Sequence, residues 1–182
     1  METSKPGQAG IALKWAVICE IISILITVAF QALKVDQNGP AKYINYIPLI
    51  IFLVLAQLEY RKQNGGFMRY GEGFVEGLLY GIFTGILGAI FLYIYVSYIN
   101  PGLLDQAFAA AHQASIDRGA TGDQLDQADH ITKIILSPPV FAVLGLLATV
   151  IFAIIIALIT SAITKREPTL ADIERQQNDP AV

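Results

Sequence analysis

Long apolar runs alternate with short polar segments along most of the chain, and this alternation is the main structural signal in the sequence. A helix needs about 20 consecutive apolar residues to cross a membrane. Four runs approach or exceed that length, at about residues 10–33, 43–60, 73–99 and 138–163. The pattern predicts an all-α fold, a four-helix transmembrane bundle.

The polar segments divide the chain around these runs. A short N-terminal segment, residues 1–9, and a polar tail, residues 165–182, flank a membrane domain at 10–164. The second loop turns at Gly65-Gly66, because paired glycines favour turns. Span two reads as apolar on all sides, which predicts a peripheral, lipid-facing helix.

Residues 100–137 form the one long connection, between spans three and four. Asn100-Pro101-Gly102 breaks the third span, and Gly119 separates two helix-like stretches. Thr121 and Gln124 fit a capping box that would open the second of them. A 38-residue irregular loop is improbable in so small a domain. We therefore expect an extracytoplasmic helical hairpin here.

Span three carries a row of glycines along one face. A four-residue step returns to nearly the same side of a helix, so these residues leave a groove without side chains. Span four has a matching row of small residues. In lipid, such rows allow two helix backbones to approach closely. The two rows are Gly73, Gly77, Gly81, Gly85 and Gly88, and Gly145, Thr149, Ala153, Ala157 and Ser161.

These two rows predict that spans three and four pack on each other. The alternative is that the glycine groove binds a second copy of the chain. Both readings treat the glycines as helix-packing residues. Neither treats them as a phosphate-binding loop, because a four-residue glycine period is a packing pattern.

Span one has a polar seam along one face, formed by Ala16, Glu20, Ser23, Thr27 and Gln31. Glu20 lies near the middle of the span, where an ionised carboxylate is costly. Glu20, Ser23 and Thr27 are therefore the candidate intramembrane polar site, for a proton or a cation. The alternative, which we favour, is that Glu20 is protonated or hydrogen-bonded and holds helices together.

Other ionisable residues give weaker signals. Glu72 and Glu76 lie at the start of span three beside several charged residues. We interpret them as a solvated interfacial cluster, and the alternative is a substrate gate. In the hairpin, Asp126 and His130 share a helix face, but two ligands do not make a metal site. The hairpin has five Asp against Arg118 and Lys133, so binding to nucleic acid is not expected. No metal or cofactor is predicted.

Composition and the distribution of charge indicate a membrane protein and its orientation. Hydrophobic residues make up 54% of the 182 and charged residues 15%, which excludes an ordinary soluble domain. The single cysteine, Cys19, excludes an intrachain disulfide. Eight basic residues lie in the N-terminal segment, second loop and tail when Lys14 at the start of span one is counted with them, and four lie elsewhere. By the positive-inside rule, we expect a multi-pass protein of the cytoplasmic (inner) membrane with both termini cytoplasmic.

Sequence motifs typical of common enzyme classes are missing: there is no P-loop, G-x-S-x-G or H-E-x-x-H. We therefore expect no enzyme. The expected partners are the lipid bilayer and either a second copy of the chain or another membrane protein. The function expected is structural or partner-binding; the alternative is a transporter or channel component for a small solute, ion or proton that uses Glu20.

Several of these segments also resemble a known family. They are the short basic loop that leads into the glycine-rich third span, Asn-Pro at the start of the hairpin, and Ser-Pro-Pro before span four; the most specific stretches are 69–85 and 100–139. The chain resembles the domain of unknown function 4199 family of small bacterial membrane proteins over about residues 8–166. The resemblance implies a multi-pass inner-membrane protein and supplies no activity.

Overall fold

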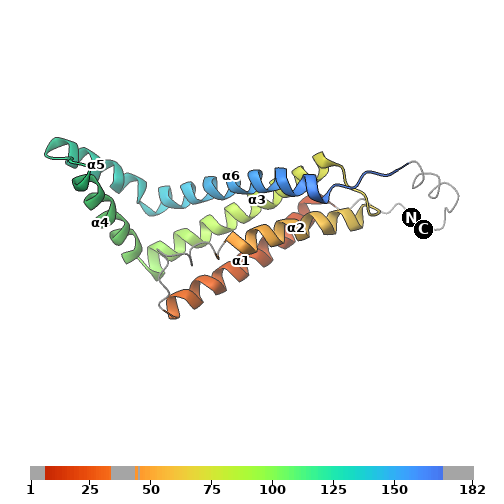
Figure 1. Ribbon diagram of the computed structural model, residues 1–182. Helices are drawn as coiled ribbons and strands as arrows, with labels where there is room; N and C mark the ends of the chain where they lie inside the picture. The colour runs from red at the N-terminus through yellow and green to blue at the C-terminus, as the bar shows by residue number, and fades with distance from the viewer. Residues whose placement is uncertain (1–6, 34–43, 45, 170–182) are drawn as a thin grey trace. The chain divides into compact units, whose positions relative to one another are not determined.

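The structure, a computed structural model, describes residues 7–33, 44 and 46–169. These residues are helical and contain no β-strand beyond one isolated backbone pair, Met68 with Arg166. The elements are α1 (Gln8–Ala32), α2 (Tyr46–Gln63), α3 (Tyr70–Ile94), the π-helical turn η2 (Tyr95–Ile99), α4 (Gly102–Asp117), α5 (Asp123–Ile135) and α6 (Pro138–Thr164) (Figure 1).

The chain divides into two compact units, residues 1–84 with 150–182, and residues 85–149. The first unit holds α1, α2, the first half of α3 and the last half of α6. The second holds the rest of α3 with η2, α4, α5 and the start of α6. The predicted N-terminal segment, first loop and tail fall largely on residues outside the described ranges.

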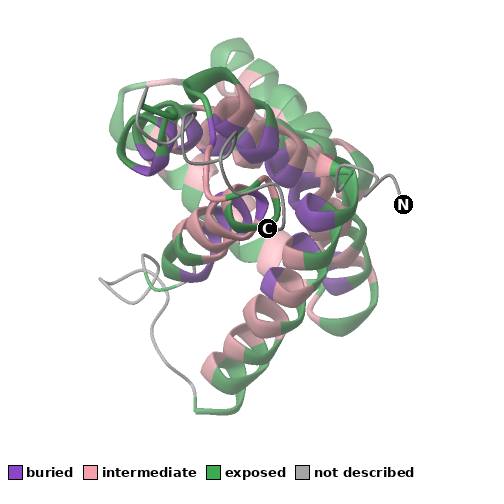
Figure 2. Ribbon diagram, turned by 90° about the vertical axis from the view of Figure 1, so that its right-hand side faces the viewer, coloured by how far each residue is buried: buried purple, intermediate pink, exposed green. Residues whose placement is uncertain are grey.

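In the first unit, α1 and α2 pack against each other along one face of each helix. The buried side of α1 consists of small and aliphatic residues, and Figure 2 shows buried positions on one side of the helices. Trp15 of α1 stacks on Phe52 of α2, with 5.7 Å between ring centroids. The buried residues of α1 are Ile11, Ala12, Ala16 and Cys19.

The prediction that span two is apolar on all sides is wrong. Its helix, α2, has a buried face that recurs at helical spacing and that includes a polar residue, Gln57, with no exposed surface. One glutamine in a long apolar run does not alter the hydrophobic pattern enough to reveal this face. The buried residues of α2 are Pro48, Leu49, Leu53, Ala56, Gln57 and Tyr60.

Small residues of α3 and α6 meet in the first unit. A Cβ placed on Gly77 would lie 2.5 Å from Ala157 Cβ, and one on Gly81 would lie 2.4 Å from Ala153 Cβ. A Cβ on Gly73 would lie 3.2 Å from Ser161 Oγ. Residue numbers rise along one helix and fall along the other, so the two helices run antiparallel at this seam.

The loop between α2 and α3 is tied to the end of α6. The turn predicted at Gly65-Gly66 is present, and both glycines have positive φ values of 70° and 86°. Beyond it, Met68 and Arg166 exchange backbone hydrogen bonds of 2.9 and 2.8 Å. The Arg61 guanidinium also donates to the Thr164 carbonyl at 2.9 Å. These bonds satisfy backbone groups that the helix ends leave open.

In the second unit, α4 and α5 pack on each other. His112 Nδ1 of α4 lies 2.8 Å from both carboxylate oxygens of Asp129 on α5. The predicted capping box at Thr121 is wrong, because α5 begins at Asp123 and its N-cap is Gly122, without a side-chain hydrogen bond. Gly122 has φ 54° and ψ −130°, a backbone conformation that other residues rarely adopt.

Three of the described helical segments are long and apolar enough to cross a membrane: Gln8–Ala32, Tyr70–Ile99 and Pro138–Thr164. α2 is not among them. Its 18 residues extend about 27 Å at 1.5 Å per residue, and its last turns contain Glu59, Arg61 and Lys62. The fourth span therefore stays a prediction.

Candidate functional site

A buried polar cluster joins three helices of the first unit, and Gln57 of α2 is at its centre. The Gln57 amide Nε2 donates to the Gly73 carbonyl of α3 and to Ser161 Oγ of α6, both at 3.0 Å. Thr164 Oγ1 lies 3.1 Å from Gln57 Oε1 and 2.8 Å from the Thr160 carbonyl, so its one proton is shared between these two acceptors. The Gly73 carbonyl accepts only, so it fixes which end of the amide carries the nitrogen.

Each bond of this cluster contributes modestly, about 0.6–1.5 kcal/mol net. Their effect on geometry is larger, because one side chain holds α2 against both α3 and α6. Gln57 and Ser161 have no exposed surface, and Thr164 is 5% exposed. The cluster therefore lies next to the glycine seam, and Gln57 Nε2 would be 3.4 Å from a Cβ placed on Gly77.

Glu76 of α3 is the most deeply buried acid of the described residues. Its side chain has no exposed surface, and neither carboxylate oxygen has a hydrogen-bond partner among the residues that the structure describes. The interpretation of Glu76 as a solvated interfacial charge is therefore wrong. Glu72, one turn earlier, is half-buried and accepts a hydrogen bond of 2.8 Å from the Arg69 backbone amide.

Tyr80 closes this row one turn after Glu76. It is fully buried, and its hydroxyl donates to the Leu49 carbonyl of α2 at 3.1 Å. On the α1 side, the Gln8 amide Nε2 donates to the Glu72 carbonyl of α3 at 3.2 Å. The α3 face that carries Glu76 is thus covered by α1 and α2, and sequence reasoning missed it because a single helix pattern does not show which neighbours cover which face.

The polar seam predicted on α1 is only partly buried. Glu20, Ser23 and Thr27 are each half-buried, and Gln31 is exposed. Thr27 Oγ1 donates to the Ser23 carbonyl at 2.9 Å within the helix, and Ser23 Oγ lies 4.0 Å from Cys19 Sγ. The structure therefore brings Ser23 together with Thr27 and Cys19, and places Glu20 on the same helix beside them.

The remaining small residues of the two predicted rows lie as follows. In the second unit, a Cβ on Gly145 would lie 2.9 Å from Leu92 Cδ2, and Thr149 Oγ1 donates to the Gly145 carbonyl at 2.9 Å. Gly85 is buried and Gly88 is half-buried. The structure thus brings Gly73, Gly77 and Gly81 of the predicted set against their α6 counterparts.

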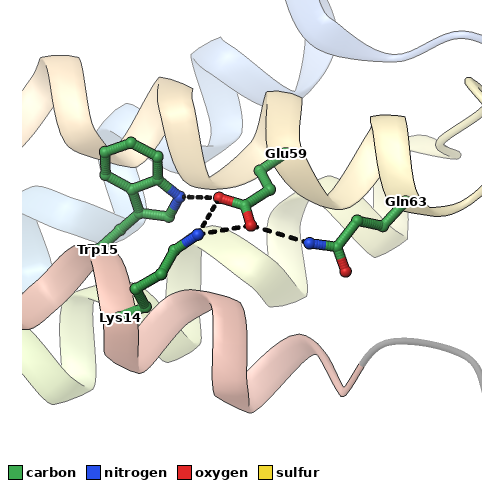
Figure 3. Close-up of polar contacts among 4 residues, drawn as sticks. All are labelled: Lys14, Trp15, Glu59 and Gln63. Atoms are coloured by element: carbon green, nitrogen blue, oxygen red, sulfur yellow. Dashed lines mark hydrogen bonds and ion pairs between the residues drawn. The ribbon is translucent and has the colours of Figure 1, made fainter.

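A second polar cluster lies near the end of α2 (Figure 3). Lys14 forms an ion pair with Glu59, and the Trp15 indole N–H donates to Glu59 Oε2 at 2.6 Å. Gln63 Nε2 donates to Glu59 Oε1 at 2.8 Å. Lys14 is about half exposed, so we assign this cluster to the surface, where such ion pairs contribute little to stability.

The described residues contain no group of three His, Cys, Asp or Glu side chains that could hold a metal ion. Asp126 and His130, which share a helix face, are both exposed. His112 instead pairs with Asp129, a contact between α4 and α5 that spacing along one helix does not reveal. This partly exposed hydrogen bond links the two helices.

The sequence was compared with protein families, with curated proteins and with solved structures. A family described as "Protein of unknown function (DUF4199)" matches residues 14–166 of the 182. Nothing among the curated proteins or the solved structures matches the chain. The match includes α2, α3 and α6 in full and therefore both the Gln57 cluster and Glu76. The chain therefore belongs to the DUF4199 family of proteins of unknown function.

Proposed function

We propose that this protein is a four-span protein of the bacterial cytoplasmic membrane with a structural or partner-binding role. The observation that supports this proposal is the interlocked packing of the first unit. Gly77 and Gly81 leave room for Ala157 and Ala153, and Gln57 bonds to both α3 and α6. Close packing of helices at small residues, together with hydrogen bonds between helices, makes a bundle rigid, as a structural role requires.

In this proposal, α2 is the fourth span, although it is shorter than the others. Its charged residues are at its C-terminal end, where Lys and Arg side chains can extend toward the headgroups. The basic residues of the α2–α3 loop and of the chain after α6 then lie on the cytoplasmic side, with α4 and α5 on the other side.

A second candidate function is transport of an ion or proton. It is favoured by the half-buried Glu20 and the buried Glu76, because acids inside apolar helices often mark ion or proton pathways. The two candidate functions can be distinguished by ion or proton flux across a membrane, which only the transport function predicts.

The test is ion and proton flux into proteoliposomes that contain wild type, Glu20→Gln or no protein. The scaffold proposal predicts that all three give the same flux. A flux that wild type supports and Glu20→Gln abolishes would contradict the scaffold proposal. A wild-type flux equal to that of empty vesicles would contradict the transport candidate.

A further inference from the structure

Glu76 of α3 is fully buried among the residues that hold α2 against α3. Glu76 lies on α3 between two positions that α2 contacts, Gly73 through Gln57 and Tyr80 through Leu49. Both carboxylate oxygens are buried without a hydrogen-bond partner among the described residues. A buried carboxylate that is ionised and unpaired costs several kcal/mol or more. Such a group needs a proton or a cation.

The charged groups at this end of the bundle do not neutralise it. On α1, Lys14 is paired with Glu59. On α2, Arg61 donates to the Thr164 carbonyl. Glu72, one turn earlier on α3, is a further acid. After the end of α6, Lys165 and Arg166 are both exposed.

The surrounding oxygens favour a proton over a metal cation. Sodium and the other hard cations require several oxygen ligands at once. Gln57 Oε1 and the Gly73 carbonyl each already have a hydrogen-bonding neighbour within the Gln57 cluster, Thr164 and Gln57, and two oxygens are too few for such a cation. The described residues also offer no cluster of three metal-ligating side chains. A single carboxyl in an apolar surround needs only one proton to become neutral.

We propose that Glu76 is a proton-binding site, which holds one proton at neutral pH while α1, α2 and α3 are packed around it. The reaction is the exchange of this proton with water, so that the neutral acid becomes a carboxylate plus a hydrated proton. The carboxylate cannot stay in the packed site without water, so release of the proton requires this end of the bundle to open. The other titratable groups at this end of the bundle include Glu59 and Tyr60 on α2 and Glu72 on α3.

The test is infrared spectroscopy of the full-length protein in lipid nanodiscs at neutral pH. A protonated carboxyl gives a C=O stretch that is distinct from the amide and carboxylate bands and shifts in D2O. The expected result is such a band in wild type and, in Glu76→Gln, the loss of the part of the band that Glu20→Gln retains. The matched control is Glu72→Gln, one turn away on the same helix and half-buried, which should keep the band. Glu20→Gln is measured in parallel, because Glu20 is a second source of this signal.

A band that persists unchanged in Glu76→Gln would overturn the proposal, and so would its absence from wild type. If Glu76→Gln does not fold, Glu76→Met takes its place. A neutral carboxyl without partners is replaceable by an apolar side chain of similar size at little cost. Failure of both variants to fold would therefore also contradict the proposal, because it would show that the carboxyl is needed as a charge or as a bonded group.

Discussion

Substitution of Gly81 by alanine tests the packing of α3 on α6 most simply. The new Cβ would lie 2.4 Å from Ala153 Cβ, whereas two carbon atoms attract best at about 3.5–4.0 Å. The helices must therefore separate by more than about 1 Å at this point, or the backbone must shift. At Gly77 the corresponding separation from Ala157 Cβ is 2.5 Å, so the same conflict arises one turn away.

The magnitude follows from two opposing effects. Overpacking of a close-packed interior costs about 1–3 kcal/mol, while replacing glycine by alanine in a helix gains at most about 1 kcal/mol. Gly81→Ala should therefore lower the free energy of unfolding by up to about 2 kcal/mol. Gly71 is the matched control, because it lies in the same helix and a Cβ there would have nothing within 4 Å. Gly71→Ala should be neutral or slightly stabilising.

The assay is thermal unfolding of both variants in one detergent. The difference between them isolates the steric conflict, and about 1–3 kcal/mol corresponds to several degrees in a protein of this size. Gly81→Ala combined with Ala153→Gly should recover part of the loss, because the second substitution removes the conflicting Cβ. If Gly81→Ala melts no lower than Gly71→Ala, or if the double variant recovers nothing, the reasoning about this seam is refuted.

Three further predictions address other features. Gln57→Leu should lower the free energy of unfolding by about 1–3 kcal/mol, because it leaves buried polar groups unpaired. The control in the same denaturation experiment is Gln63→Leu, at an exposed position of the same helix. Equal losses of unfolding free energy in the two variants would contradict this prediction. Gly122→Ala should destabilise by about 1–3 kcal/mol in thermal unfolding through backbone strain alone, and no loss would contradict it. Raising the pH should accelerate methanethiosulfonate labelling of Cys19 more in wild type than in Glu76→Gln; equal acceleration would contradict opening at Glu76.

Much of the helical arrangement could be predicted from the hydrophobic pattern, because long apolar runs allow few alternatives in a chain with so little charge. The spacing of the glycines also indicated which face of α3 is free of side chains. That α6 supplies the matching face was one of two open readings. The contacts of Gly77 with Ala157 and of Gly81 with Ala153 are intrachain, which favours this reading over a second copy.

The polar core of the first unit was not predictable in the same way. Gln57 is a single polar residue in an apolar run, and its role depends on Gly73 and Ser161, which lie far away in the sequence. Glu76 is close to other charged residues in the sequence, and such a segment is expected to be exposed to solvent. Its burial follows from coverage by α1 and α2, which is a tertiary property. The capping box predicted at Thr121 is absent, because the N-cap residue of α5 is Gly122, one residue later.

The central claim is that four helices, α2 included, cross the membrane and that both termini are cytoplasmic. It is tested by single cysteines at four exposed positions in a Cys19→Ser background, probed in intact spheroplasts with a membrane-impermeant maleimide; the positions are Gly7, Gln63, Gln127 and Glu167. The account predicts that only the cysteine at Gln127 reacts before lysis and that the other three react after it. Reaction at Gln63 in intact spheroplasts, with Gly7 protected, would show that α2 does not cross the membrane and would contradict the account.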